Sequence, residues 1–455
     1  MDFSKDNSVS TKAENISPKQ MSLGIMLSDN YGVHPGAWRM PGVDVNGYTD
    51  IDIAIKYAKQ AEDGGLEYIF VPDRAVLDAD IAQGPPRFQM EPMMMLTAIA
   101  THTKRIGLIP SVSTSLTEPY QTARQLKALD VISHGRAGWN AIATNDPSAF
   151  ANYGKQMPPR NEKYERLHET IQLVQALWGS WKCDADKPNK EGNFANPSDI
   201  HPISLQGRHV GAFGSLPIPP SEQGQPVIFQ AGGGSLGLQA FARYADVVVG
   251  MGMTIEDSRA YRNAIREAVA EAGRNPDDVK LVIFVNFGLG NTIREALDRR
   301  KKLDAQVSEF YGINQLSSFL GVPIDRKDFD KPLPASLFEN KRFSADPRTI
   351  KAIKLAKEGW SPRDLVAHGV TDYNPGVVGT QEDAADFLQE WFEAGAADGF
   401  ILVVDSIEDG IQNFTDGVIP ILKKKGLFGA NEAKMTLREN LDIPFQYGVN
   451  DKIHR

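Results

Sequence analysis

The chain has 455 residues, enough for one large α/β barrel with insertions or for two or three ordinary domains. Its 41% hydrophobic and 24% charged residues are typical of a globular protein in water, and its net charge of −9 argues against a nucleic-acid partner. No apolar run approaches the roughly 20 residues that span a bilayer, and Met1–Pro18 lacks the apolar core of a secretory signal. We therefore expect no membrane partner and a cytoplasmic location. The single cysteine, Cys183, excludes an internal disulfide framework and a zinc site built on cysteines.

Eight short apolar runs alternate with amphipathic segments along the chain. Strands are predicted at Ser22–Ser28, Leu66–Val71, Arg105–Ser113, Gly135–Ala143, Pro226–Gln230, Ala245–Gly250, Val279–Gly288 and Gly399–Val404. Helices are predicted at Asp50–Asp63, Glu91–Thr103, Glu118–Ile132, Asn161–Trp178, Leu236–Tyr244, Ile255–Ala272, Gln381–Ala394 and Gly410–Lys425. Eight strands alternating with helices predict an α/β fold of the (β/α)8 TIM barrel type. The alternative is a doubly wound open sheet, which we disfavour because no Gly-x-Gly-x-x-Gly turn follows the first strand.

Three connections are too long for simple crossovers and are interpreted as insertions. The predicted organisation is an N-terminal arm at 1–20, a barrel at 21–428 with insertions at 75–90, 181–225 and 292–379 after strands two, four and seven, and a C-terminal extension at 429–455. The second insertion is rich in Pro, Gly, Asn and Asp and includes a possible hairpin at Ile203–Val210, whereas the third has amphipathic helical segments. Because loops carry function, we expect substrate specificity to reside in these insertions.

Polar residues follow the second and third predicted strands, at the end of a parallel barrel where ligands bind. Asp73 comes directly after strand two, where it can hydrogen-bond a ligand, cap a helix or pair with Arg74. At the end of strand three, alternation sends Ser111, Ser113 and Ser115 to one face. They line a pocket if that face points inward, and the alternative is an ordinary turn rich in Ser and Thr.

Further candidates follow strands four and five. Asn140 ends strand four and offers a donor and an acceptor that suit the imide edge of a planar heterocycle, or else it closes a loop. The segment Gln230–Ser235 places three glycines before a helix, like a phosphate cradle without the lysine of a P-loop. Arg160 and Tyr164 lie four residues apart on one helix face, where they can meet a phosphate or simply face solvent.

Other kinds of site find no support in the residue spacing. The eight histidines show no metal-ligand pattern, so we predict no metal site, and no Ser/His/Asp arrangement can be argued. Three large aromatic residues, Trp38, Phe88 and Trp139, are candidates for an apolar pocket wall, although such residues more often belong to the core.

Six stretches taken together resemble one protein family. They are HPGAWR (His34–Arg39), YIFVPD (Tyr68–Asp73), EPYQTARQLKALDVISHGRAGWN (Glu118–Asn140), KYERLHE (Lys163–Glu169), PVIFQAG (Pro226–Gly232) and VVGTQEDAADFLQEWFEAGAADGFIL (Val377–Leu402). The whole chain resembles the bacterial luciferase-like flavin-dependent monooxygenases. It is most similar to the subgroup of nitrilotriacetate monooxygenase, dibenzothiophene-sulfone monooxygenase and pristinamycin IIA synthase.

This resemblance implies a (β/α)8 barrel that binds FMN non-covalently and receives it reduced, as FMNH2, from a separate NAD(P)H:flavin reductase. Reduced FMN then reacts with O2 at C4a, and the resulting peroxide oxygenates a small organic substrate. The implied outcomes are C–N cleavage, C–S cleavage or oxidation at carbon. Since relatives are commonly dimers or tetramers, a homo-oligomer is also implied. The cofactor carries most of the chemistry, while the protein positions the reactants and excludes water.

The resemblance also assigns site residues by position. Asp73 matches an aspartate beside the flavin, Ser111 stands where a threonine is usual, and Asn140 matches the asparagine after tryptophan on strand four. Tyr164 matches a helix tyrosine near the phosphate, and Gly232 lies in the cradle.

Three positions depart from the subgroup pattern. Arg160 replaces a frequent histidine four residues before the tyrosine, and Gly234 replaces a usual serine, with Ser235 next. We expect Arg160 to offset the lost hydroxyl through a charge-assisted bond to the phosphate. Asn145 stands where relatives can carry a serine proposed to act on the peroxide or the substrate, so Asn145 and its neighbour Thr144 are the candidate catalytic residues.

Two alternative functions stay open at this point. The same fold can serve an F420-dependent oxidoreductase that transfers hydride, although the longer anionic tail of that cofactor requires more basic residues at the barrel mouth. A flavin-binding protein without catalysis is the other alternative, because the residues at Gly234 and Asn145 depart from the pattern.

Overall fold

Eight parallel strands close into a barrel in the computed structural model, which describes residues 20–77, 80–87, 90–183, 188, 190–339, 342–429 and 435–447. The barrel strands are β1 (Ser22–Met26), β2 (Tyr68–Val71), β3 (Gly107–Ser113), β4 (Gly138–Ile142), β7 (Val227–Ala231), β8 (Val247–Gly250), β9 (Lys280–Leu289) and β11 (Gly399–Val404). Each pairs with the next in that order, and β11 pairs in turn with β1. This closure confirms the predicted (β/α)8 barrel and rules out the open sheet.

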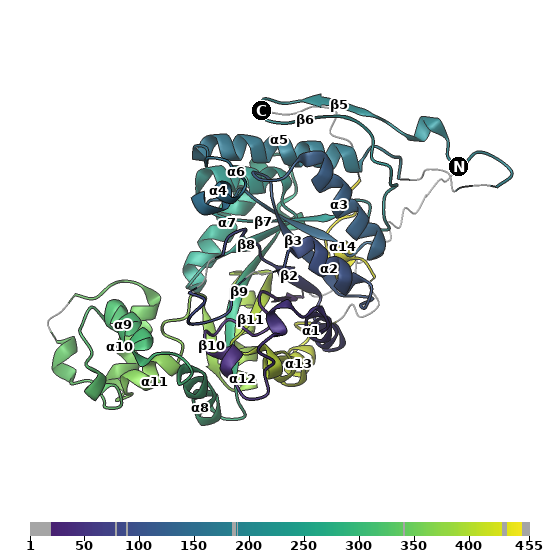
Figure 1. Ribbon diagram of the computed structural model, residues 1–455. Coiled ribbons are helices and arrows are strands. Elements are labelled where there is room, and N and C mark those ends of the chain that lie inside the picture. The colour runs from purple at the N-terminus through teal and green to yellow at the C-terminus, as the bar shows by residue number, and fades with distance from the viewer. Residues whose placement is uncertain are drawn as a thin grey trace, which may run out of the picture.

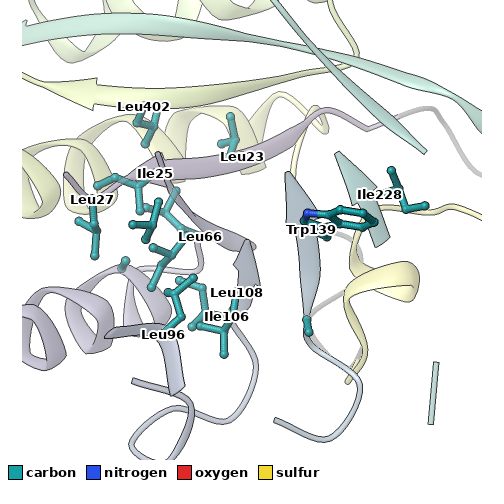
Figure 2. Close-up of a cluster of buried hydrophobic side chains, with 14 of the residues drawn as sticks. Leu23, Ile25, Leu27, Leu66, Leu96, Ile106, Leu108, Trp139, Ile228 and Leu402 are labelled. Atoms are coloured by element: carbon teal, nitrogen blue, oxygen red, sulfur yellow. The ribbon is translucent and has the colours of Figure 1, made fainter. Parts of the chain in front are cut away.

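Helices cover the outside of the barrel (Figure 1). They are α1 (Ile51–Asp63), α2 (Pro92–Ala100), α3 (Pro119–Ile132), α5 (Arg160–Trp178), α6 (Gly234–Tyr244), α7 (Ile255–Glu271), α12 (Gln381–Glu393) and α13 (Ile407–Lys424). The main core lies between the strands and these helices, and Figure 2 shows part of it around Leu23, Ile25 and Leu108. Within the described ranges, every helix is too short or too polar to cross a lipid bilayer.

Trp139 belongs to this core. Its side chain is fully buried, its ring meets that of Trp178 edge-on at 6.1 Å between centroids, and its Nε1–H donates to the Val112 carbonyl at 3.2 Å. Figure 2 shows it among the apolar side chains of the core. Trp139 therefore stabilises the packing of β4 on α5, and the alternative interpretation as a pocket wall is wrong.

The C-terminal segment seals the amino-terminal end of the barrel. Its short helix α14 (Leu437–Asn440) places Leu437 in one apolar cluster with Tyr68 and Phe229 from the barrel interior. A Cβ on Gly107 would lie only 2.5 Å from the Leu437 Cδ1, so α14 packs closely against the start of β3. The buried Arg438 joins the same floor through an ion pair with Asp246 at 3.1 Å.

The segments between the barrel units have structures of their own. Between α5 and β7, the antiparallel strands β5 (Ile203–Gln206) and β6 (Gly211–Gly214) form a hairpin at the top of Figure 1. The predicted hairpin range Ile203–Val210 therefore holds the first strand and the turn, and the second strand follows it. The connection after β4 contains a short helix, α4 (Pro147–Asn152), which Asp146 caps through the Ser148 amide at 2.9 Å.

The segment after β9 carries the helices α8 (Ile293–Asp304), α9 (Glu309–Leu320), α10 (Pro347–Lys357) and α11 (Pro362–Ala367). Residues of α9 to α11 share a separate apolar cluster, and Figure 1 shows these helices to one side of the barrel. A ninth strand, β10 (Gly376–Gly379), pairs with the end of β9 and was not predicted. Its four residues lack a pattern of their own, and the strand exists only because β9 extends beyond β8.

Candidate active site

A cavity of about 620 Å³ opens at the carboxyl ends of β2, β3, β4 and β7. Seven of the predicted site residues line it: Asp73, Ser111, Thr144, Asn145, Arg160, Tyr164 and Gly232. A cavity of this size is typical of a site for a small molecule or cofactor. The strand ends thus bring together side chains that are up to 159 residues apart in the sequence.

Asn140 is not itself among the residues that line this cavity, but it lies directly beside Ser111, which is. The two residues are paired across β3 and β4, and the Asn140 Nδ2 donates to the Ser111 Oγ at 2.7 Å. The Asn140 Oδ1 is buried without a partner, and so is the Oε1 of Gln230 on neighbouring β7. Buried polar atoms are nearly always hydrogen-bonded in proteins, so two orphaned oxygens on neighbouring strands indicate a ligand that donates hydrogen bonds. Sequence reasoning quoted Gln230 only as the start of the glycine segment.

Asp73 faces the cavity as a carboxyl group in a partly buried setting. Arg74 pairs with Asp146 at 2.9 Å instead, and Glu91 caps α2, so both alternative roles of Asp73 are excluded. Burial, and secondarily the charge of Glu91, raises the pKa of Asp73 to about 6. Glu91 also lines the cavity, and sequence reasoning missed it because 18 residues separate the two carboxylates.

The hydroxyl cluster after β3 serves two purposes. Ser111 bonds Asn140, whereas the Ser113 Oγ lies 2.7 Å from the Thr144 Oγ1 and accepts from the amides of Ser115 and Leu116. Ser113 therefore fastens the turn after β3 to the loop after β4. Ser111 fits the prediction of a hydroxyl that faces the cavity, whereas Ser113 also fits the alternative of a turn rich in Ser and Thr.

Lys163 holds the two candidate catalytic residues in place. Its Nζ donates to the Asn145 Oδ1 at 2.7 Å and to the Thr144 carbonyl at 3.2 Å. Burial, and secondarily the charge of Arg160, lowers the pKa of this ammonium. Sequence reasoning missed Lys163. It lies four residues before Leu167 on the buried face of α5, and a lysine on an apolar helix face is the only indication in the sequence of a special role.

At the outer end of the cavity, helix α5 begins with Arg160 and helix α6 begins after Gly233. Helix α6 begins after Gly233, whose position has no side-chain cap, so the first N–H groups of the helix are free for an anion. The Arg160 Nη2 donates to the Gly233 carbonyl at 2.8 Å, and its guanidinium lies 5.7 Å from the Tyr164 ring centre. The Tyr164 hydroxyl lies beside Gly232. This end is suited to a phosphate group.

The remaining candidates lie further from the cavity. Gly234 lies next to the Arg160 side chain: a Cβ at this position would be 2.9 Å from the Arg160 Nη2. Ser235 is exposed on the first turn of α6 and is not among the lining residues. Trp38 lines a different cavity, and Phe88 lies outside the described residues. In the part of the chain that the structure covers, no three His, Cys, Asp or Glu side chains are grouped to hold a metal ion.

The raised pKa of Asp73 predicts a pH-dependent stability. The folded protein binds the proton of the Asp73 carboxyl group more tightly than the unfolded chain does. Protonation of Asp73 therefore stabilises the fold fully below about pH 4, and this stabilisation is lost as pH rises through about 6. Asp73→Asn should therefore raise the free energy of unfolding at pH 7.5 by about 1–2 kcal/mol, allowing for partial exposure, and leave it nearly unchanged at pH 4.5. Urea unfolding at both pH values measures this, and an equal effect at the two would contradict it.

Comparisons with known proteins agree with this geometry. The chain matches the luciferase-like monooxygenase family over residues 21–398. It is 31% identical to N-acetyl-S-(2-succino)cysteine monooxygenase of Bacillus subtilis over 437 residues, covering 93% of this chain and 97% of that protein. It is also 31% identical to nitrilotriacetate monooxygenase component A of Aminobacter aminovorans over 443 residues, with the same coverage of 93% and 97%. The solved structure of EDTA monooxygenase from Chelativorans sp. BNC1 has a TM-score of 0.79 at 28% identity, covering 94% of this chain and 99% of that chain.

These matches confirm the predicted family and the predicted subgroup, of which nitrilotriacetate monooxygenase is a member. They also agree with the closed barrel, since the superposition spans nearly the whole of both chains. The chain belongs to the luciferase-like monooxygenase family and is a flavin-dependent monooxygenase.

Proposed function

We propose that this protein is the oxygenase component of a two-component system, which uses reduced FMN and O2 to oxygenate a small organic substrate with C–N or C–S cleavage. The observation that carries this proposal is the polarity of the cavity of about 620 Å³, which has orphaned acceptors at one end and an anion site at the other. FMN has the same polarity, because its ring system carries an imide and its tail ends in a phosphate. When bound and reduced, FMN supplies the electrons that activate O2.

We assign the inner end of the cavity to the flavin ring. Asn140 and Gln230 offer buried acceptors to ring N–H groups, Ser111 orients the Asn140 amide, and Asp73 lies at the same rim. A carboxyl group with a pKa near 6 is protonated in part of the molecules at neutral pH, so Asp73 can accept or donate a hydrogen bond.

We assign the outer end to the phosphate. Arg160 and Tyr164 provide the side-chain donors, while Gly232, Gly234 and Ser235 lie at the start of α6 and provide backbone N–H groups. The cluster holds one arginine beside one tyrosine, which suits a single phosphate. The F420 alternative has a longer anionic tail. Of the basic residues that line the cavity, Arg74 is paired with Asp146 and Lys163 is bonded to Asn145, so Arg160 is the arginine placed for a phosphate.

Asn145 and Thr144 are proposed to orient the reacting groups. Neither side chain titrates near neutral pH, so they act as hydrogen-bond donors or acceptors and not as acids or bases. The Asn145 Oδ1 accepts a hydrogen bond from Lys163, so the Asn145 Nδ2 is the group left to bind a ligand. Asn145 lines the cavity. Thr144 is held by Ser113. This prior fixation positions both residues without a conformational change.

A separate NAD(P)H:flavin reductase is proposed as the partner, and a homo-oligomer, either a dimer or a tetramer, as the assembly. The relative from Aminobacter is named component A, which supports a system of more than one component. Size-exclusion chromatography with light scattering tests the assembly, and a mass of one 50.0 kDa chain would contradict it.

The function is tested with the purified protein, FMN, NADH and a flavin reductase, on a panel of amines, sulfones and aminocarboxylates. We expect a product that contains one oxygen atom from labelled O2, formed only when the reductase is present. Turnover without oxygen would contradict the proposal, and turnover with reduced F420 in place of FMN would favour hydride transfer. Flavin binding without any product across the panel would favour the non-catalytic alternative.

A further inference from the structure

A second chamber lies on the other side of the barrel rim. It consists of two cavities of about 350 and 500 Å³ that share a wall formed by His34, Arg87, Val307, Ser308 and Tyr311. The chamber is built by the loop after β1, the insertion after β2 and the helical segment after β9. None of its lining residues comes from 181–225, so that insertion contributes nothing to this chamber within the described ranges.

The walls of this chamber are tied together by the His34–Arg39 motif. The His34 Nε2 lies 2.9 Å from an Asp304 oxygen on α8, and the Gly36 amide donates to the His34 Nδ1 at 3.0 Å. A Cβ at Gly36 would sit 2.3 Å from the Leu303 carbonyl, so the loop approaches α8 as closely as glycine permits. The Arg39 Nη2 donates to the Gln83 carbonyl at 3.2 Å, which fixes the insertion after β2 to the same loop. The motif therefore gives the chamber a defined shape.

Arg87 differs from the other arginines that line the chamber. The others are engaged: Arg300 with Asp372 at 2.8 Å, Arg348 with Asp346 at 2.7 Å, Arg363 with Asp330 at 2.6 Å and Arg39 with the Trp38 ring at 4.1 Å. Arg87 is exposed, and no hydrogen bond or ion pair to it exists among the residues the structure describes, although its charge acts on Asp29. The nearby Asp29 is occupied by the amides of Tyr31 and Gly32, both at 3.1 Å. The shared wall thus presents a guanidinium whose donors are all available.

Orphaned donors in the same chamber point to an acceptor-rich ligand. The Trp38 Nε1 and the Arg300 Nε are buried without a partner, and the Asp304 Oδ2 is the corresponding buried acceptor. Among the buried side-chain atoms of this chamber, two donors and one acceptor therefore lack a partner. A carboxylate accepts several hydrogen bonds in a plane, and a guanidinium matches it with two parallel N–H groups.

We propose that this chamber binds the substrate of the flavin-dependent reaction, and that Arg87 holds a carboxylate group of that substrate. This inference rests on the proposed function, because it assigns the substrate class of the same enzyme. The aromatic side chains of Trp38 and Tyr311 contact the remainder of the molecule. Arg87 acts as a specificity-determining residue and takes no part in flavin binding, since it does not line the flavin cavity.

The test uses matched pairs of small molecules, the carboxylates succinate and iminodiacetate and their diamides, titrated by calorimetry into the protein saturated with FMN. Saturation occupies Arg160, the other candidate anion site. We expect the carboxylates to bind and the diamides to bind at least tenfold more weakly. Arg87→Gln should weaken carboxylate binding at least tenfold, with Arg87→Lys between Arg87→Gln and the natural protein. Arg259→Gln, which changes an exposed arginine on α7, should have no effect.

The outcomes separate this inference from the proposed function. Equal binding of diamides and carboxylates, no binding of either, or an unchanged affinity in Arg87→Gln overturns the inference. FMN fluorescence titration of the same variants shows whether the flavin site is intact, and Arg87→Gln should leave it unchanged. If FMN fails to bind while Arg87 still selects carboxylates, the proposed function fails and the carboxylate site remains.

Discussion

Arg438→Met should lower the free energy of unfolding by about 3–5 kcal/mol, because it removes one partner of a buried ion pair. The Arg438 side chain is 3% exposed and contacts Asp246 at 3.1 Å. It also donates to the carbonyls of Gln225 at 2.9 Å and Pro444 at 3.0 Å. Its loss leaves the buried Asp246 carboxylate without its ion-pair partner. Urea unfolding followed by circular dichroism measures the change.

Two further variants isolate the cause. Adding Asp246→Asn to Arg438→Met should recover part of the loss, because the unpaired charge disappears while the residue can still accept from the Ile228 amide. Arg259→Met changes an exposed arginine and should stay within about 0.5 kcal/mol of the natural protein. A loss below about 1 kcal/mol in Arg438→Met would show that the C-terminal segment does not stabilise the barrel floor.

Arg160→Ala should weaken FMN binding by roughly 10- to 100-fold, the value of one or two charge-assisted hydrogen bonds to a phosphate. Arg160 lies at the first turn of α5 beside the free N–H groups of α6, so the anion would meet both at once. Quenching of FMN fluorescence on titration with protein measures the affinity. Asn161→Ala, at the next and exposed position of the helix, serves as the control. An unchanged affinity in Arg160→Ala would remove the phosphate assignment at this end.

Gly234 provides an independent check on Arg160. Gly234 has a φ of +76°, and a side chain there would sit 2.9 Å from the Arg160 Nη2. Gly234→Ser should therefore displace Arg160 and weaken FMN binding, both by this contact and by backbone strain. In the Arg160→Ala background, Gly234→Ser should weaken FMN binding less than it does in the natural protein, because the contact with the Arg160 side chain is absent. The two departures from the family pattern are thus adjacent in space, since a Cβ at position 234 would reach the flexible end of the Arg160 side chain.

The strand pattern predicted most of the fold for a physical reason. Parallel strands buried on both faces need continuous apolar runs, such as Tyr68–Val71, and these runs are visible without any tertiary information. The position of Asp73 and Ser111 at strand ends was sufficient to predict one shared cavity, because the carboxyl ends of parallel strands meet at one rim. Asn140 lies beside Ser111 but is not among the lining residues. Short elements such as α4 and β10 were missed, since six or four residues carry too little periodicity.

The sequence by itself determined the barrel, the family and the rim on which the site lies, because these depend on local patterns and on strand order. Only the tertiary structure showed Lys163 holding Asn145, Glu91 beside Asp73, and Arg438 closing the barrel floor. Each of these contacts joins distant parts of the chain or depends on a loop path and a side-chain rotamer. A sequence pattern records the face on which a residue lies, but it does not record which atom that residue meets.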